Sequence, residues 1–217
     1  MGEGFIIGCN NCIKEEDIKN LWNEKFKING TYFDIHLGGL MLCFCKEQLE
    51  KRYGVYKNYN REYRLLAAGD PPEEIYETLG SATNDPEIDN IIIQNINNGY
   101  EFTEELGDYA YYCKGCKKLF NRFYFQMKKD KQIYTPEYIC KKCNNFLELV
   151  NVKLNEYDGI GLEDDETENE PIEIKYKYEL YLENGIVKLK NNEGNKDIIC
   201  DYCKQDNFSI LSSYMAD

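Results

Sequence analysis

Residues 111–120, YYCKGCKKLF, contain two cysteines separated by two residues, and residues 137–146, EYICKKCNNF, repeat this arrangement. Together they read CxxC-x23-CxxC, with β-type sequence between and after the pairs. In a zinc knuckle the two-residue spacer lets both thiolates point into one concavity, and two knuckles complete a tetrahedron. The pattern is typical of a zinc ribbon. It predicts a four-cysteine zinc site formed by Cys113, Cys116, Cys140 and Cys143.

A redox role for one CxxC pair is the main alternative at this site. Thioredoxin-like pairs precede a helix within alternating strands and helices, whereas here a strand is expected after the knuckle. Four thiolates around a divalent ion leave no open position for a substrate or water. We therefore expect a structural site and not a catalytic one.

Two further CxxC pairs lie near the ends of the chain, Cys9 with Cys12 and Cys200 with Cys203. Each lacks a nearby partner knuckle, so the first pair is predicted to share a second zinc with the last. Such a site would bring the termini together, as domains commonly do. The prediction is two zinc ions per chain.

The remaining cysteines, Cys43 and Cys45, have a one-residue spacer within LMLCFCKEQ, which is expected to begin a helix. Residues i and i+2 of a helix diverge, so both are interpreted as buried small apolar residues. In the rival hypothesis they complete the first site and leave Cys200 and Cys203 free.

The predicted fold class is α+β: zinc-ribbon β-structure with a helical insertion between the first and second CxxC knuckles. Helical spacing of apolar residues is found in residues 13–26, in 40–54 and in three stretches between 58 and 97. Strands are expected at GFIIG and TYFDIHL and throughout the chain after residue 100. Asn184-Gly185 is predicted to form the type I′ turn of a hairpin.

We expect the chain to form one unit, residues 1–217, because it is long enough to bury a sizeable core. Within that unit five segments are expected, namely terminal zinc knuckles with a helix (1–57 and 191–217), a helical segment (58–99), the central zinc ribbon (100–153), and an acidic loop with a β-hairpin (154–190).

The charge and the apolar content of the sequence limit the classes of function that the protein can have. The net charge of −13 makes the whole molecule repel nucleic acid and anionic membranes, so any such binding would be local. No apolar run approaches the roughly 18 residues needed to span a bilayer, and the N-terminus does not resemble a signal peptide. A cytoplasmic protein without a membrane partner is expected. Cysteines in such a chain more often bind metal than form disulfides.

The central ribbon differs from the rest of the chain in charge. Residues 113–143 hold nine basic residues and two acidic ones, interleaved with aromatic residues. Single-stranded nucleic-acid binders use this mixture for backbone attraction and base stacking. The alternative is that the lysines compensate the anionic zinc site and that the aromatic residues face the core. The candidate partner or nucleic-acid surface is Lys117, Lys118, Arg122, Tyr124, Lys128 and Lys129.

The acidic stretch 154–174 carries nine carboxylates and no basic residue. It is interpreted as a solvated loop, because the ligand spacing of an EF-hand is missing. Alternatives are calcium binding, partner binding, or a cover over the basic ribbon.

The layout resembles a group of uncharacterised bacterial zinc-ribbon proteins. The matching elements are an N-terminal CxxC (Cys9, Cys12), a glycine-rich segment running into a helix (residues 37–40), the central cysteines, and a C-terminal CxxC before an aromatic, Asp-ended tail (residues 214–217). This chain departs from the group by a helix at 14–27 and by the loop and hairpin at 155–190. The resemblance implies that the first knuckle pairs with the last, and it supplies no activity.

We find no phosphate loop, nucleophile elbow or zinc-hydrolase motif, and His36 is the only histidine. The sequence therefore indicates a non-enzymatic scaffold or adaptor with two structural zinc ions. A protein partner is the first hypothesis, and single-stranded nucleic acid or a transcription-related role is the alternative.

Overall fold

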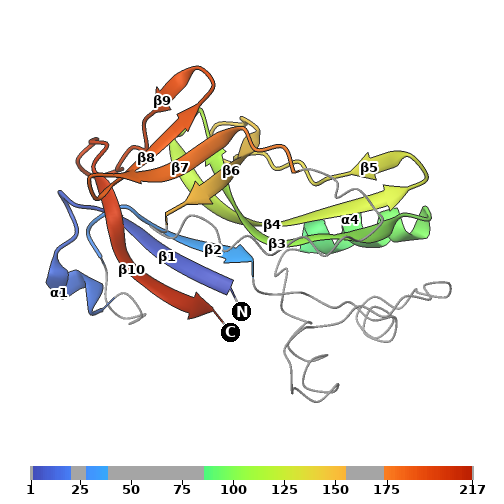
Figure 1. Cartoon of the computed structure of the whole chain (residues 1–217), viewed down its shortest axis with the longest axis horizontal. Helices are drawn as coiled ribbons and strands as arrows, with labels where there is room; N and C mark the ends of the chain where they lie inside the picture. The colour runs from blue at the N-terminus through green and yellow to red at the C-terminus, as the bar shows by residue number, and fades with distance from the viewer. Residues whose placement is uncertain (1, 21–27, 39–85, 155–173, 217) are drawn as a thin grey trace, which may run out of the picture.

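The computed structural model describes residues 2–20, 28–38, 86–154 and 174–216, and these form a mostly β structure (Figure 1). The strands are β1 (Gly2–Cys9), β2 (Tyr32–Gly38), β3 (Glu101–Cys113), β4 (Lys118–Lys129), β5 (Gln132–Tyr134), β6 (Leu147–Lys153), β7 (Tyr178–Glu183), β8 (Ile186–Asn191), β9 (Gly194–Lys196) and β10 (Phe208–Ala216). The helices in these residues are α1 (Glu15–Ile18) and α4 (Pro86–Asn97).

The ten strands form one branched sheet. Its main order is β10-β1-β2-β3-β6-β7-β8-β9, and β4 pairs with both β3 and β5 outside that path. The long strand β3 pairs with β4 along one edge, from Glu101 to Cys113, and with β2 and β6 at separate positions. Only the β6–β7 pairing is parallel among the described strands. The central ribbon is thus part of the sheet that also contains the chain ends.

The predicted α+β class with a helical insertion is wrong. Strands dominate the described residues, and the one helix of more than a single turn among them, α4, precedes β3. The last of the three helical stretches expected between residues 58 and 97 did identify that helix. The prediction gave too little weight to pairing between strands that are far apart in the sequence. Local periodicity does not report such pairing.

Several other predictions fall on residues outside those described. They are the second half of the helix at 13–26, the helix at 40–54 with Cys43 and Cys45, the helical stretches before residue 86, and most of the acidic loop. The division of the chain into five segments also stays a prediction.

The two ends of the chain lie side by side because β1 and β10 are antiparallel neighbours. Gly2 pairs with Ala216 and Cys9 with Phe208 (Figure 1). The apolar strand residues of GFIIG are buried in this arrangement. The predicted strand at TYFDIHL is confirmed as β2, the other neighbour of β1.

The buried side chains form two clusters, and β3, β4 and β6 contribute residues to both. The first joins α4 to β3, β4 and the central knuckles, through Ile88, Ile92, Tyr111, Phe123, Phe125 and Met127. The second joins β1, β2 and β10 to the β7–β8 hairpin, through Phe5, Ile7, Ile35, Leu180, Leu189 and Phe208. The buried cysteines Cys113 and Cys140 belong to the first cluster, and Cys9 and Cys200 to the second.

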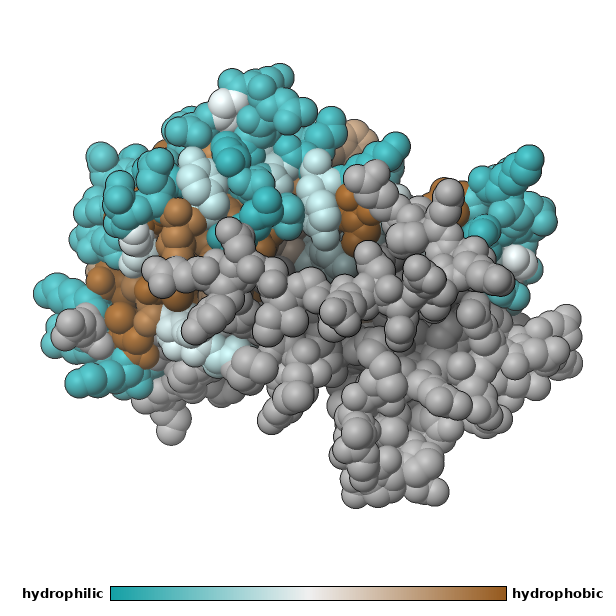
Figure 2. Space-filling view, viewed as in Figure 1, coloured by the Kyte–Doolittle hydropathy of each residue, from teal (hydrophilic) through white to brown (hydrophobic). Residues whose placement is uncertain are grey.

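The β7–β8 hairpin turns at Asn184-Gly185, as predicted. Both residues have positive φ, 52° and 76°, which a type I′ turn requires. The outer part of the molecule around β8 and β9 is hydrophilic on the face shown in Figure 2. Neither described helix is long and apolar enough to cross a membrane.

Candidate metal centres

The eight paired cysteines gather into two groups of four, each with all its sulfur atoms within 4.8 Å of one another. The central cluster is Cys113, Cys116, Cys140 and Cys143, and the terminal cluster is Cys9, Cys12, Cys200 and Cys203. The first cysteine of each knuckle is buried and the second is partly exposed. The pairing of the first knuckle with the last, and the assembly of the central ribbon site, are therefore seen in the structure.

Both clusters have the same crossed arrangement. In the central cluster the Sγ atoms of Cys113 and Cys143 are 3.3 Å apart, and those of Cys116 and Cys140 are 3.7 Å apart. In the terminal cluster the corresponding distances are 3.5 Å for Cys9–Cys203 and 3.7 Å for Cys12–Cys200. All eight cysteines are free thiols and not disulfides.

These separations fit four sulfur ligands around one tetrahedral metal ion. With metal–sulfur bonds of about 2.3 Å, the edge of the tetrahedron is about 3.8 Å. Four thiolates in this geometry favour zinc or iron over hard cations such as Mg²⁺ and Ca²⁺. The residues present in each cluster thus fit a closed metal site.

A repeated backbone bond shapes each knuckle. The carbonyl oxygen of the first cysteine accepts a hydrogen bond from the N–H four residues later, from Ile13 at 2.9 Å, Lys117 at 2.7 Å, Asn144 at 2.8 Å and Lys204 at 3.0 Å. The last three donors have positive φ values between 54° and 62°. This left-handed residue reverses the chain after the second cysteine, so that both sulfur atoms stay on the inner side of the turn.

Gly115 fills a knuckle position where no side chain fits. A Cβ atom placed there would lie 2.1 Å from Asn145 Nδ2 and 2.8 Å from Cys143 Sγ. The close approach lets Asn145 reach the sulfur atom of Cys143 and donate a hydrogen bond from Nδ2 at 3.3 Å. Glycine is thus required at this position because a ligand and its supporting amide pass directly over the backbone.

Hydrogen bonds to sulfur lower the pKa of one cysteine in each cluster. Asn145, first through its side chain and then through its backbone N–H, holds the pKa of Cys143 at about 6. For Cys200 burial raises the pKa, but hydrogen bonds led by the Cys203 N–H and the Thr31 side chain outweigh it and give a pKa of about 5. Burial raises the pKa of Cys9 and of Cys116, the latter to about 12. Each cluster therefore holds a stabilised thiolate beside thiols that a metal ion must deprotonate.

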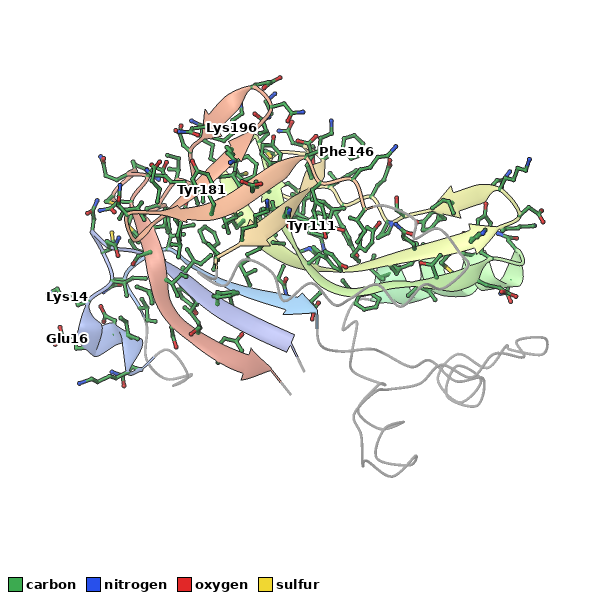
Figure 3. All side chains as sticks on the ribbon, in the orientation of Figure 1. Lys14, Glu16, Tyr111, Phe146, Tyr181 and Lys196 are labelled. Atoms are coloured by element: carbon green, nitrogen blue, oxygen red, sulfur yellow. The ribbon has the colours of Figure 1, made fainter. Side chains whose placement is uncertain are left out.

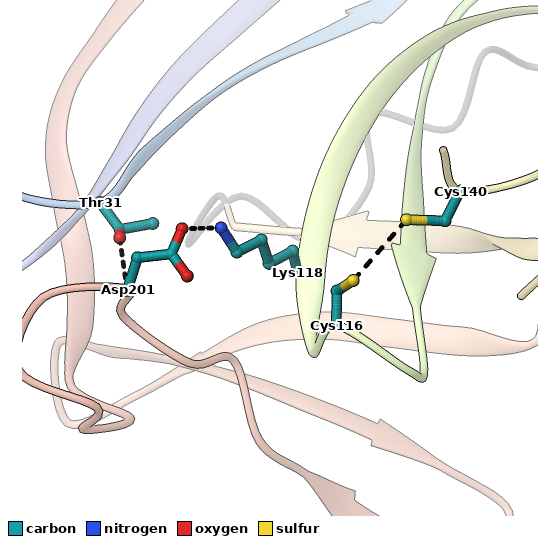
Figure 4. Close-up of polar contacts among 5 residues, drawn as sticks. All are labelled: Thr31, Cys116, Lys118, Cys140 and Asp201. Atoms are coloured by element: carbon teal, nitrogen blue, oxygen red, sulfur yellow. Dashed lines mark hydrogen bonds and ion pairs between the residues drawn. The ribbon is translucent and has the colours of Figure 1, made fainter. Parts of the chain in front are cut away.

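The two clusters are linked because residues directly after Cys116 contact residues next to Cys200. Lys117 pairs with Asp197 at 2.5 Å, and its carbonyl oxygen accepts a bond from the Ile199 N–H at 2.9 Å. Lys118 forms an ion pair with Asp201 (Figure 4). The Asp201 N–H in turn donates to Thr31 Oγ1 at 2.8 Å. The residues after Cys116 thus contact those on both sides of Cys200.

The candidate nucleic-acid surface is not assembled as a set of free cations and stacking rings. Lys117 and Lys118 pair with carboxylates of the chain, and Tyr124 is 3% exposed. Lys128 and Lys129 are exposed, and Lys129 donates to the Asn98 carbonyl at 2.6 Å. Arg122 is also exposed and lies over the Phe120 ring. Binding of single-stranded nucleic acid by this surface stays a prediction. Because Tyr124 is buried, its ring is not available for stacking on a base.

Sequence reasoning missed the polar residues that support the sulfur atoms. Asn11 Nδ2 lies 4.0 Å from Cys203 Sγ, and Asn11 Oδ1 accepts a bond from Asn207 at 2.9 Å. Asn145 and Thr31 act as described above. The asparagines inside or directly after the knuckles were the available signal, since their amides can reach a neighbouring sulfur.

Comparisons with protein-family models, with curated proteins and with solved structures gave no match. The resemblance to bacterial zinc-ribbon proteins therefore rests on the sequence elements named above, namely the order of the cysteine pairs, the glycine-rich segment 37–40 and the tail 214–217. The two four-cysteine clusters are the part of it that the structure supports.

Proposed function

We propose that this protein is a zinc-binding scaffold in which two closed four-cysteine sites have a structural role. The observation that supports the proposal is the gathering of eight cysteine sulfur atoms into two groups of four, each with its sulfur atoms within 4.8 Å of one another. Each site uses four thiolates, so zinc bound there would have no open position for catalysis. Zinc would stabilise the fold, because a site that forms only on folding adds its binding free energy to the folding free energy.

The scaffold is proposed to bind a protein partner and to be non-enzymatic. Thiolate sites of this kind are maintained where thiols stay reduced, so a cytoplasmic location is part of the proposal. Single-stranded nucleic acid is less well supported, because Lys117 and Lys118 have carboxylate partners and Tyr124 is buried.

X-ray absorption at the metal edge tests the metal assignment. Protein purified without chelators is expected to contain zinc with four sulfur neighbours at about 2.3 Å. Iron in place of zinc, or oxygen and nitrogen neighbours, would contradict the assignment.

Affinity capture tests the proposed protein partner. Zinc-loaded protein should retain a defined protein that a variant lacking Cys113 and Cys140 does not retain.

A further inference from the structure

Lys118 lies at the boundary between the two metal centres. It forms an ion pair with Asp201, the residue directly after Cys200. The side chain of Lys118 is 18% exposed, whereas that of Lys117, which pairs with Asp197 at the same boundary, is 48% exposed. Figure 4 shows the Lys118 side chain extending from β4 toward Asp201. Of these two cations, Lys118 is therefore the one that is largely shielded from solvent.

The charges that act on Lys118 come from both metal centres. Burial is the largest cause of the lowered pKa of Lys118, and the charges of Lys142 and Lys204 lower it further. The charges of Cys116 and Cys200 act in the opposite direction. Cys116 belongs to the central cluster and Cys200 to the terminal cluster. One ammonium group thus lies within electrostatic reach of a sulfur ligand from each centre.

Hydrogen bonds next to the ion pair hold the two segments together. The Ile199 N–H donates to the Lys117 carbonyl at 2.9 Å, and the Tyr112 hydroxyl donates to the Asp197 carbonyl at 2.8 Å. Tyr112 belongs to the second buried cluster, and its neighbour Tyr111, labelled in Figure 3, belongs to the first. Successive residues of a strand face opposite sides, so β3 packs on both. The Lys118 ammonium is therefore placed by segments that are already joined.

A cation at this position favours the metal-loaded state of both centres. Four thiolates and one divalent ion carry a net charge of about −2. Without metal, Cys116, with a pKa of about 12, is a neutral thiol at neutral pH. A nearby positive charge stabilises the more negative state, and the attraction is stronger where solvent is excluded. The carboxylate of Asp201 has the opposite effect and offsets part of the attraction.

We propose that Lys118 is a positioning residue for both metal centres, whose positive charge acts through the sulfur ligands and strengthens metal binding at each. The inference rests on the proposed function, because it concerns the affinity of the two zinc sites on which the scaffold depends. It gives one side chain, outside both sets of ligands, a role in each site.

Alkylation of the eight cysteines at buffered concentrations of free zinc tests the proposal. Peptide mass spectrometry of the 217-residue protein reports the protection of each cysteine, so it yields a separate zinc affinity for each cluster. Lys118→Met keeps the aliphatic stem and removes the charge. It should weaken zinc binding at both clusters by about 10-fold to 100-fold, the range typical of partners of metal ligands. Lys118→Arg keeps the charge and should restore most of the affinity.

Asp201→Asn separates an effect of charge from a structural effect of the ion pair. It breaks the same pair, but it removes a negative charge and keeps the backbone N–H of residue 201 that donates to Thr31 Oγ1. Zinc binding should therefore be as tight as in the parent protein or tighter. Lys118→Gln, which keeps a polar head group, gives the same test as Lys118→Met if the latter does not fold.

Lys114→Met is the matched control. Lys114 is exposed in the same knuckle, where solvent screens its charge, so this variant should leave both affinities unchanged.

The proposal is overturned if the uncharged variants of Lys118 bind zinc like the parent protein at either cluster, if Lys118→Arg restores no affinity, or if Asp201→Asn weakens binding. The parent protein in the same experiment separates this result from the proposed function. Zinc that protects the parent cysteines, with no effect of Lys118→Met, contradicts only the role of Lys118. Parent cysteines that zinc does not protect contradict the scaffold itself, and the role of Lys118 with it.

Discussion

At the residue scale, each cluster depends on a few positions that are not cysteines. The amide of Asn145 reaches the sulfur atom of Cys143 only because Gly115 leaves the space above its backbone free. Hydrogen bonds to a metal ligand orient it and stabilise its thiolate form. These positions therefore allow metal affinity to be changed without removing a ligand.

Gly115→Ala should weaken metal binding at the central cluster by about 10-fold to 100-fold, the range typical of changes around a metal ligand. The new methyl group would collide with Asn145 and Cys143, so that the amide loses its bond or the sulfur atom moves. Competition with a chromophoric chelator measures the affinity. Lys114→Ala, at an exposed position of the same knuckle, is the matched control and should match the parent protein. Parent-like affinity in Gly115→Ala would contradict the tight packing described here.

Asn145→Ala should raise the pH at which the central cluster releases its metal. The Asn145 side chain is the first cause of the lowered pKa of Cys143, about 6. A thiolate with a lowered pKa resists protonation until the pH falls through that value, so losing the bond lets protons compete with the metal at higher pH. An acid titration that follows metal release checks this. The terminal cluster of the same molecule is the internal reference, and an unchanged release curve would show that the amide does not support the thiolate.

At the element scale, strands β10, β1 and β2 are held together by a side chain of β10 that packs directly against Gly4 of β1. A Cβ atom at Gly4 would lie 2.2 Å from the Tyr214 ring, whose hydroxyl donates to Asp34 Oδ1 at 2.5 Å. The ring from β10 thus crosses β1 to reach β2. This packing lies in the part of the sheet that leads to the terminal cluster.

Gly4→Ala should destabilise the protein by about 1–3 kcal/mol, as overpacking typically does. Chemical denaturation of the metal-loaded protein measures the loss. Combining it with Tyr214→Leu removes the opposing ring and should recover part of the stability. A Gly4→Ala protein as stable as the parent, or a double variant with fully additive losses, would contradict the crossing of β1 by Tyr214.

Some of these features could be predicted from the sequence, and others could not. The CxxC spacing and the Asn184-Gly185 dipeptide encode geometry over a few residues, so the clusters and the hairpin turn were predictable. The sharing of β3 between β2, β4 and β6 was not, because strand pairing over long distances leaves no local period in the sequence.

At the scale of the whole molecule, the terminal cluster closes nearly the entire chain. Cys12 and Cys200 are 188 residues apart, whereas the facing cysteines of the central cluster are separated by 24 and 30 residues. By analogy with a covalent cross-link, closing a loop of this length removes unfolded-state entropy worth about 5 kcal/mol. The terminal cluster should therefore contribute more to stability through closure than the central one, and the central cluster should keep its ligands when the chain ends are removed.

The central claim is that two independent closed metal sites exist and that one of them joins the chain ends. Native mass spectrometry of the intact chain and of a chain ending at Lys190 tests it most directly. We expect two zinc ions in the first and one in the second, with Cys9 and Cys12 becoming reactive toward thiol reagents. The 217-residue chain with Cys200→Ser and Cys203→Ser should give the same count as the shortened chain, which separates loss of ligands from loss of β9 and β10. If the shortened chain keeps two ions and leaves Cys9 and Cys12 protected, the terminal site does not join the chain ends and the account is contradicted.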